Sequence, residues 1–445
     1  MDFNQILKIT GMIVWGPHML VLMVGIGLYL TIRLNFIQLS HIVKSIKYIW
    51  SGFRKRDRSE QNEGEISPFQ ALMTSLGGAV GNGNIAGVAT AITFGGPGAI
   101  FWMWIAALVG MATKFSEVVL GVKFRKKEKD GSFSGGPMYY LRDGLNLKIL
   151  AYIFAFAMGM KTLFSTSIVQ GNSISLVVKS ELGIPMVFTG IFLSIITWVV
   201  IIGGIKSIGR IAEILSPFMV ILYLVGGLVV ILMYYKNIPS VLYRILKSAF
   251  TGSSVAGGFA GSTVLMSMRY GVARGAYSNE AGTGSAAVVH AVARTQEPVR
   301  QGLIAMMDVF MDTIVICSIT ALPILLTGEW TKGITSTEMT ASVFSKGIPV
   351  IGGLIVMVSS FLFGYSSLIS WVYYGEQCFS FLFGKWIKKP FRWGYCLIII
   401  AGAVIKVESV WNLGDTLNGL MALPNLIGLA FLGGVVSKLV KDNFK

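Results

Sequence analysis

Apolar runs long enough to cross a lipid bilayer recur along the whole sequence. A membrane-spanning helix needs about 20 mainly apolar residues, and this chain of 445 residues is 54% hydrophobic and only 13% charged. We count eleven such runs, at residues 12–32, 69–94, 99–122, 149–178, 186–203, 212–234, 257–293, 299–327, 349–382, 391–406 and 411–438. The sequence therefore predicts an all-α polytopic protein embedded in a lipid bilayer.

The basic residues support this count. The net charge is +16, and most of the Lys and Arg residues fall in alternate loops, such as 44–58 and 123–129, as cytoplasmic loops do. With eleven spans, this bias places the N-terminus outside and the C-terminus in the cytoplasm. We therefore expect a multi-pass protein of a bacterial-type plasma membrane. The charge is explained by topology, so no nucleic acid partner is expected.

One apolar run contains an unusual glycine-rich segment. Residues 77–87 read GGAVGNGNIAG, and five of these eleven residues are glycine. Because Gly costs about 1 kcal/mol relative to Ala inside a helix, two such turns are not expected to stay regularly helical. In hydrocarbon, unwound backbone is tolerated only where protein or a water-filled cavity satisfies its polar groups. The segment predicts an interrupted helix facing a ligand, or a Gly-rich helix that packs closely against a neighbour.

A weak internal repeat relates this segment to the seventh span. The pattern Asn-x-Ala-Gly occurs at 84–87 and again at 279–282. The second and seventh spans are five apart, so they cross the membrane in opposite directions, which is typical of inverted-repeat secondary transporters. We expect an N-terminal extra helix and basic cytoplasmic loop at 1–66, a first five-helix repeat at 67–240, and a second repeat with a cytoplasmic tail at 241–445.

Interrupted helices offer two kinds of ligand. Half-helix N-termini suit a carboxylate, and free carbonyls suit a small hard cation such as sodium. Gly81, Asn82 and Gly83 are the preferred donors for a substrate carboxylate. The substrate-binding prediction as a whole comprises Ala79, Gly81, Asn82, Gly83, Asn84, Gln170, Ser278 and Asn279, to which the family resemblance described below adds Tyr277.

Polar residues in two other spans allow more than one interpretation. The buried amide of Gln170 needs a partner, which is either a ligand or a neighbouring helix. The adjacent hydroxyls of Ser366 and Ser367 could bind sodium, or they could bond back to their own helix.

Ionisable residues within the spans are further functional candidates. They are Lys114, Glu117, Lys161, Arg269, Arg274, Glu280, Asp308, Asp312, Glu376 and Asp415. None is assigned to the substrate, because a carboxylate would repel its acid group. Glu280 or Asp312 could instead serve a proton-coupled carrier. No nucleotide motif, nucleophile–base pair or metal cluster is present in the sequence, which argues against a primary pump, an enzyme and any cofactor other than a coupling ion.

Several longer motifs resemble the alanine or glycine:cation symporter family, whose members are sodium-coupled amino-acid carriers of the amino acid–polyamine–organocation superfamily. They are GNGNIAGVATA (81–91), FGGPGAIFWMW (94–104), GGPMYYL (135–141), SNEAGTGSA (278–286) and DTLNG…ALPNLIGL (415–429). The resemblance implies a LeuT-like 5+5 inverted repeat plus one extra N-terminal helix. It also implies symport of alanine or glycine, and possibly serine, with sodium by alternating access, and we expect a monomer. The alternative is a proton-coupled small amino-acid transporter.

The resemblance also assigns roles to residues. It implies that the Asn82 and Gly83 amides hold the substrate carboxylate, and that Gln170 and Tyr277 line its pocket. The implied sodium ligands are the carbonyls of Gly77, Val80 and Phe363 and the hydroxyls of Ser366 and Ser367. Two positions depart from the family pattern, which tends to have threonine near Ser367 and phenylalanine at Tyr277. A polar Tyr277 would favour serine or glycine beside alanine.

Overall fold

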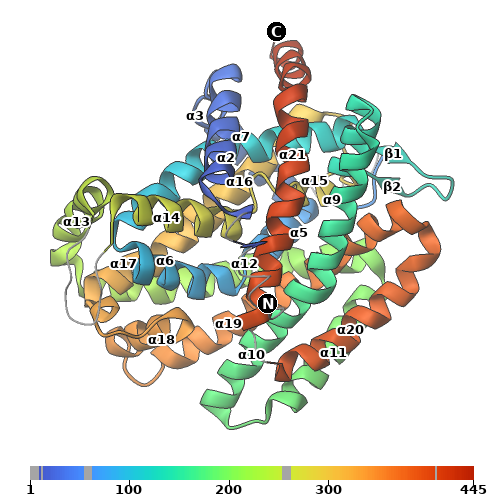
Figure 1. Ribbon diagram of the computed structural model, residues 1–445. Coiled ribbons are helices and arrows are strands. Elements are labelled where there is room, and N and C mark those ends of the chain that lie inside the picture. The colour runs from blue at the N-terminus through green and yellow to red at the C-terminus, as the bar shows by residue number, and fades with distance from the viewer. Residues whose placement is uncertain (1–9, 12–13, 55–62, 253–261, 406–407, 445) are drawn as a thin grey trace.

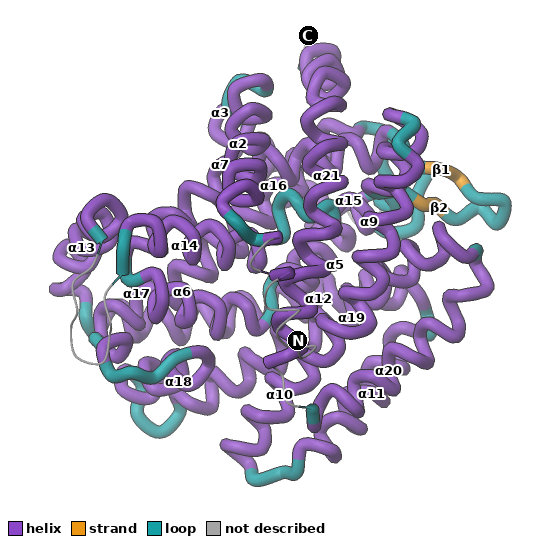
Figure 2. Tube along the Cα trace, viewed as in Figure 1, coloured by secondary structure: helices purple, strands orange, loops and turns teal. Residues whose placement is uncertain are grey.

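The computed structural model describes residues 10–11, 14–54, 63–252, 262–405 and 408–444. These residues are almost entirely helical, and a short antiparallel pair, β1 (Lys126–Lys127) and β2 (Phe133–Ser134), stands out at one edge (Figure 2). Six helices are long and apolar enough to cross a membrane. The prediction of an all-α membrane protein is confirmed.

Each of the eleven expected spans corresponds to one helical segment of the described chain, counting interrupted helices as one. The segments are α2 (Pro17–Arg33), α5 (Pro68–Ala79) with α6 (Val88–Gly95), α7 (Gly98–Lys123), α9 (Lys148–Lys161) with α10 (Ser167–Leu182), α11 (Met186–Ile201), α12 (Gly204–Met233), α14 (Val264–Asn279) with α15 (Ser285–His290), α16 (Pro298–Val309) with α17 (Ser318–Thr327), α19 (Gly352–Phe383), α20 (Lys388–Val404) and α21 (Glu408–Asn443).

Further helices connect these segments. The longer ones are α4 (Ile42–Arg54), α13 (Ile238–Thr251) and α18 (Ser336–Gly347), and the short ones are α3 (Ile37–Ser40), α8 (Pro137–Tyr139), η3 (Tyr140–Gly144), η5 (Tyr235–Asn237), η7 (Glu329–Thr331) and η8 (Lys385–Ile387). The hydropathy runs do not reveal α13 or α18, because both carry charged and polar residues among their apolar ones.

The second span is interrupted where its sequence is richest in glycine. A capping box formed by Ser67 and Gln70 begins α5, and the helix ends at Ala79, where Val80 turns to an extended conformation (φ −71°, ψ 101°). Residues Gly83–Gly87 form the wide-turned segment η2, which continues into α6. The expected helix break is therefore present.

The seventh span is interrupted as well. Helix α14 ends at Asn279, and Glu280, Gly282 and Gly284 all have positive φ (57°, 89° and 81°) before α15 begins. Gly adopts this backbone conformation without the steric cost that a side chain brings. Both breaks predicted from the sequence are thus found. The first directly precedes its Asn-x-Ala-Gly pattern, which lies in η2, and the second begins within the pattern at 279–282.

The two breaks meet inside the helical bundle. Helix α5 packs against α12, α19, α15 and α16, near the middle of the molecule (Figure 1). Segment η2 contacts both α14 and η6 (Phe310–Cys317), the wide-turned stretch that joins α16 to α17. Three interrupted or distorted segments therefore converge at one place.

Candidate functional site

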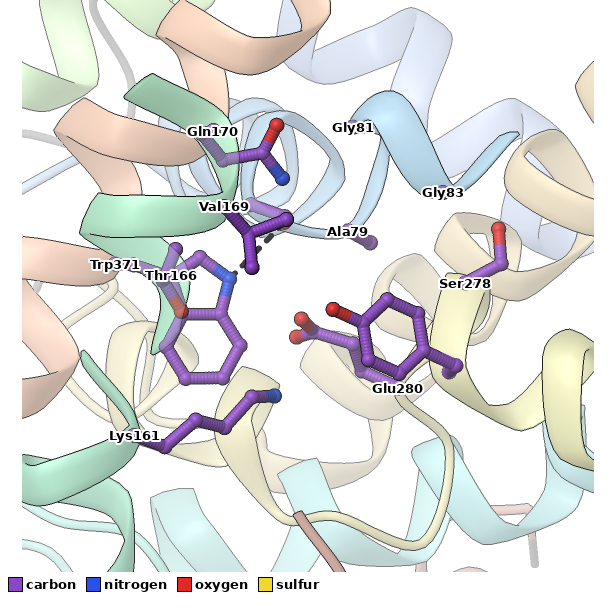
Figure 3. Close-up of a pocket in the computed structure, with 12 residues that line it drawn as sticks. Ala79, Gly81, Gly83, Lys161, Thr166, Val169, Gln170, Ser278, Glu280 and Trp371 are labelled. Atoms are coloured by element: carbon purple, nitrogen blue, oxygen red, sulfur yellow. Dashed lines mark hydrogen bonds between the residues drawn. The ribbon is translucent and has the colours of Figure 1, made fainter. Parts of the chain in front are cut away.

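A small cavity lies between the two helix breaks (Figure 3). Its volume is about 30 Å³, and a single water needs roughly 10–15 Å³. Backbone from the first break, side chains from the second, and residues of α9, α10, η4 (Thr162–Thr166) and α19 line it: Gly78, Ala79, Gly81, Gly83, Lys161, Thr166, Val169, Gln170, Tyr277, Ser278, Glu280 and Trp371. Only small chemical groups fit in this enclosure.

The backbone amides of the first break differ in whether they already have a hydrogen-bond partner. The Gly81 amide donates to Asn84 Oδ1 at 3.0 Å, so this amide already has a partner. The amides of Asn82 and Gly83 lie at the N-terminal end of the helical stretch formed by η2 and α6, where a helix leaves amides without intrahelical partners. The backbone at Asn82 and Gly83 is therefore the stronger candidate for a carboxylate.

Gln170 finds a partner for its buried amide on a neighbouring segment. Its Oε1 accepts from Asn82 Nδ2 at 2.9 Å, and Asn82 Oδ1 in turn accepts from Ser360 Oγ at 2.6 Å. At the same time Gln170 lines the cavity. This chain of hydrogen bonds joins the first break to α10 and α19.

The five predicted sodium ligands lie close together, because the hydroxyls of Ser366 and Ser367 contact the carbonyls of the other three. Ser366 Oγ lies 2.9 Å from Gly77 O, 3.5 Å from Val80 O and 2.9 Å from Phe363 O. Ser367 Oγ lies 3.4 Å from both Gly77 O and Val80 O. Oxygens held about 2.4 Å from a hard cation stand about 3.4 Å apart in an octahedron. The Ser366–Val80, Ser367–Gly77 and Ser367–Val80 distances have this spacing, whereas the two 2.9 Å distances are hydrogen bonds that Ser366 Oγ donates to Gly77 O and Phe363 O. Ser366 also bonds within its own helix, at the Phe363 carbonyl.

Comparison with known proteins identifies the family. The model of the sodium:alanine symporter family matches residues 1–445. The chain belongs to the sodium:alanine symporter family. A relative described as sodium/alanine symporter AgcS, from Methanococcus maripaludis, is 44% identical over 444 residues, which cover 98% of this chain and 96% of the relative. A probable sodium/glutamine symporter, GlnT from Bacillus subtilis, is 36% identical over 441 residues. These cover 99% of this chain and 90% of the relative. The chain is thus a membrane transporter and not an enzyme.

Solved structures support the fold. The transporter MhsT in complex with L-phenylalanine superposes with a TM-score of 0.57 at 13% identity, covering 85% of this chain and 98% of the other. A sodium-coupled sialic acid symporter gives a TM-score of 0.52 at 12% identity, covering 99% and 86%. The LeuT-like fold predicted from the family resemblance is confirmed.

Three residues predicted to bind substrate are not among those that line the cavity: Asn82, Asn84 and Asn279. The Asn82 side chain bonds to Gln170 and Ser360 instead. Asn84 Nδ2 donates to Asp312 Oδ1 at 2.6 Å, and Asn279 Nδ2 donates to Thr313 Oγ1 at 3.0 Å. Asn279 Oδ1 accepts from the Ala281 amide at 2.9 Å. Asn84 and Asn279 fix the shape of the breaks, whereas Ser278 and Tyr277 do line the cavity.

The prediction missed several residues of this symporter's cavity wall. Lys161 Nζ lies 3.9 Å from the centre of the Trp371 ring and donates to Asn418 Oδ1 at 2.8 Å. Trp371 Nε1 donates to Gly78 O at 3.1 Å. Glu280 lines the cavity beside Lys161 (Figure 3). The only signal in the sequence was that Lys161 and Glu280 are ionisable residues within spans.

Proposed function

We propose that this chain transports alanine, and glycine beside it, across the plasma membrane together with sodium, by alternating access. One observation carries the proposal: the five-oxygen set and the cavity share the first helix break. Gly77 and Val80 contribute oxygens to the set, while Ala79 and Gly81 line the cavity. An ion that orders this break also orders the substrate site. By thermodynamic linkage, the substrate then raises the affinity for the ion by the same factor.

The roles follow from position. The Asn82 and Gly83 amides would hold the substrate carboxylate, with Ala79, Gly81, Gln170, Tyr277 and Ser278 around it. Asn84 and Asn279 would act by holding the two breaks. The carbonyls of Gly77, Val80 and Phe363 and the hydroxyls of Ser366 and Ser367 would hold sodium. The cavity volume of about 30 Å³ favours glycine, alanine and serine over larger amino acids.

Alternating access would use the two proposed five-helix halves, 67–240 and 241–445, and residues from both ranges line the cavity. We propose that the transporter is a monomer with its N-terminus outside and its C-terminus in the cytoplasm, since this orientation places most basic loop residues inside.

Substitutions at the Asn82–Gln170 hydrogen bond test the pocket. Asn82→Leu and Gln170→Ala should each lower alanine uptake about tenfold, because each removes a buried polar partner whose loss costs about 1–3 kcal/mol. Uptake is measured in proteoliposomes with equal amounts of protein. The matched control is Asn172→Ala on the same helix, whose amide bonds to Ala403 O and Ile405 O away from the cavity. Uptake of both variants at the wild-type level would contradict the assigned pocket.

The Trp371 ring should limit substrate size. Trp371→Leu enlarges the cavity, so valine should compete with alanine uptake about tenfold more strongly, since one methylene in a pocket is worth about 1–3 kcal/mol. Competition by unlabelled valine against labelled alanine measures this effect. A competition profile that stays restricted to glycine, alanine and serine would show that Trp371 does not set the size limit.

The proposed function is tested by uptake of radiolabelled alanine into proteoliposomes with an inward sodium gradient, and with potassium in its place. Accumulation above equilibrium with sodium alone is expected, and competition by glycine and serine sets the substrate range. Uptake that ignores sodium but requires acid outside would favour the alternative, a proton-coupled carrier using Glu280 or Asp312.

A further inference from the structure

Asp312 is a buried carboxylate that connects the two helix breaks. Its side chain is fully buried. Asn84 Nδ2, from the first break, donates to Oδ1 at 2.6 Å, and Ser278 Oγ, from the second, donates to Oδ2 at 2.8 Å. Thr313 Oγ1 also donates to Oδ2, at 2.7 Å. One carboxylate therefore accepts hydrogen bonds from both segments that form the transport site.

This carboxylate has no cationic partner in the described chain. The Lys114 ammonium pairs instead with Asp308, at 3.3 Å, and the Lys161 ammonium bonds to Asn418. Around these two cations the bundle buries four carboxylates, those of Glu117, Glu280, Asp308 and Asp312. A buried charge that lacks a partner is costly, and an ionisable residue at membrane depth is a functional candidate by default.

Ser278 connects Asp312 to the wall of the cavity. Ser278 is one of the residues that line the cavity, and its hydroxyl donates to the carboxylate. A hydroxyl is both a donor and an acceptor, so it can pass a proton from cavity water to the carboxylate without any larger opening of the protein.

We propose that Asp312 binds and releases a proton in each sodium-driven transport cycle, with Ser278 as the relay. This inference rests on the proposed function and adds a second coupled cation to it. The surroundings favour a proton over a metal ion, because the neighbours present donors to the carboxylate. Asn84 faces it with its NH₂ group, and Asn84 Oδ1 is occupied by the Gly81 amide. A metal ion would find too few free oxygen lone pairs there.

The proton transfer involves only the cavity water, Ser278 and Asp312. Ser278 Oγ accepts a proton from a hydronium ion in the cavity and passes its own proton to Asp312 Oδ2, which leaves water and a neutral carboxylic acid. The Ser278 hydroxyl can then turn toward Cys317 Sγ, 3.5 Å away. The buried charged groups on the same and the adjacent elements are Asp308 with its partner Lys114, and Glu117 and Glu280.

Protonation should loosen the connection between the breaks. The ionised carboxylate holds Asn84 and Ser278 through charge-assisted hydrogen bonds, which are about twice as strong as neutral ones. Once the carboxylate is neutral, the two interrupted helices can separate more easily, as alternating access requires. Because the relay opens to the substrate cavity, the proton enters and leaves on the same side as alanine.

The first test follows protons directly. Wild-type protein is reconstituted in vesicles that contain a pH-sensitive dye, with the membrane potential clamped and an inward sodium gradient. Adding alanine should acidify the lumen in wild type, whereas Asp312→Asn should take up alanine more slowly and without acidification. Wild-type alanine uptake without any acidification, or equal acidification by Asp312→Asn, would overturn the proposal.

The second test does not depend on Asp312→Asn being active. Thr313→Val removes one donor from the carboxylate and also the acceptor of Asn279 Nδ2, so the readout is the pH midpoint of uptake and not its rate. Because the anion is less stable, this midpoint should rise by about one pH unit. The matched control is Thr320→Val, because Thr320 donates to the Asn84 carbonyl at 2.9 Å but not to Asp312. Equal midpoints for the two variants would contradict a titrating Asp312.

Infrared spectroscopy separates this proposal from the proposed function. Acidification should produce the carbonyl band of a protonated carboxylic acid that is present in wild type and missing in Asp312→Asn, even without any substrate. Failure of sodium-driven uptake in wild type would contradict the transport function, while the absence of this band would contradict protonation of Asp312.

Discussion

Replacing Ser366 and Ser367 together with alanine should lower the apparent affinity for sodium about 100-fold. Each hydroxyl contributes one oxygen to the set formed with the carbonyls of Gly77, Val80 and Phe363. A hydrogen-bond-like contact to a charged group is worth about 1.5 kcal/mol or more, so losing two contacts corresponds to about two factors of ten. The sodium concentration that gives half-maximal alanine uptake measures this change.

The double substitution has a matched control on the same helix. Ser359 is also fully buried in α19, and its hydroxyl has no hydrogen-bond partner among the residues that the structure describes. Ser359→Ala should therefore leave the sodium dependence unchanged. If the double variant kept the wild-type sodium dependence, the cation site would have to lie elsewhere.

Adding a single methyl group at Gly81 should lower alanine uptake about 10- to 100-fold. A Cβ atom at this position would lie 2.8 Å from Ser367 Oγ and 2.9 Å from Gln170 Nε2, closer than van der Waals contact permits. Overpacking of this kind costs about 1–3 kcal/mol, and here it displaces both a proposed sodium ligand and a cavity residue. Gly81→Ala therefore disturbs the ion site and the substrate site at once.

The same helix break supplies the control for Gly81→Ala. A Cβ atom at Gly87 would meet nothing within 4 Å, so Gly87→Ala should transport alanine at the wild-type rate. Initial uptake rates are compared at saturating sodium, with thermal stability measured in parallel. Equal uptake by the two variants would contradict the close packing of the break against Ser367 and Gln170.

The membrane spans could be predicted well because composition determines them. A run of about 20 apolar residues has few alternatives to a spanning helix, and all eleven runs match helical segments. The connecting helices α13 and α18 were not predicted, because their charged and polar residues resemble those of loops. Their position depends on contacts with distant helices such as α7 and α19, which a single sequence does not reveal.

The candidate site could be predicted only in part. Glycine-rich segments indicate the backbone contribution, because glycine is costly inside a helix unless the backbone is used. The side-chain contribution depends on pairs that are far apart in sequence. Asn84 meets Asp312 across 228 residues and Lys161 meets Asn418 across 257. No local pattern shows which polar side chain faces the cavity and which faces a neighbouring helix.

Coupling between alanine and sodium is the central claim, and it is tested most directly in reverse. Proteoliposomes are given an inward alanine gradient and equal sodium on both sides, and uptake of radioactive sodium is followed. Because linkage between the two ligands is reciprocal, the alanine gradient should drive sodium inward above its equilibrium level. The double variant Ser366→Ala, Ser367→Ala should not show this accumulation. Alanine entry without any net movement of sodium in the wild-type protein would contradict the account.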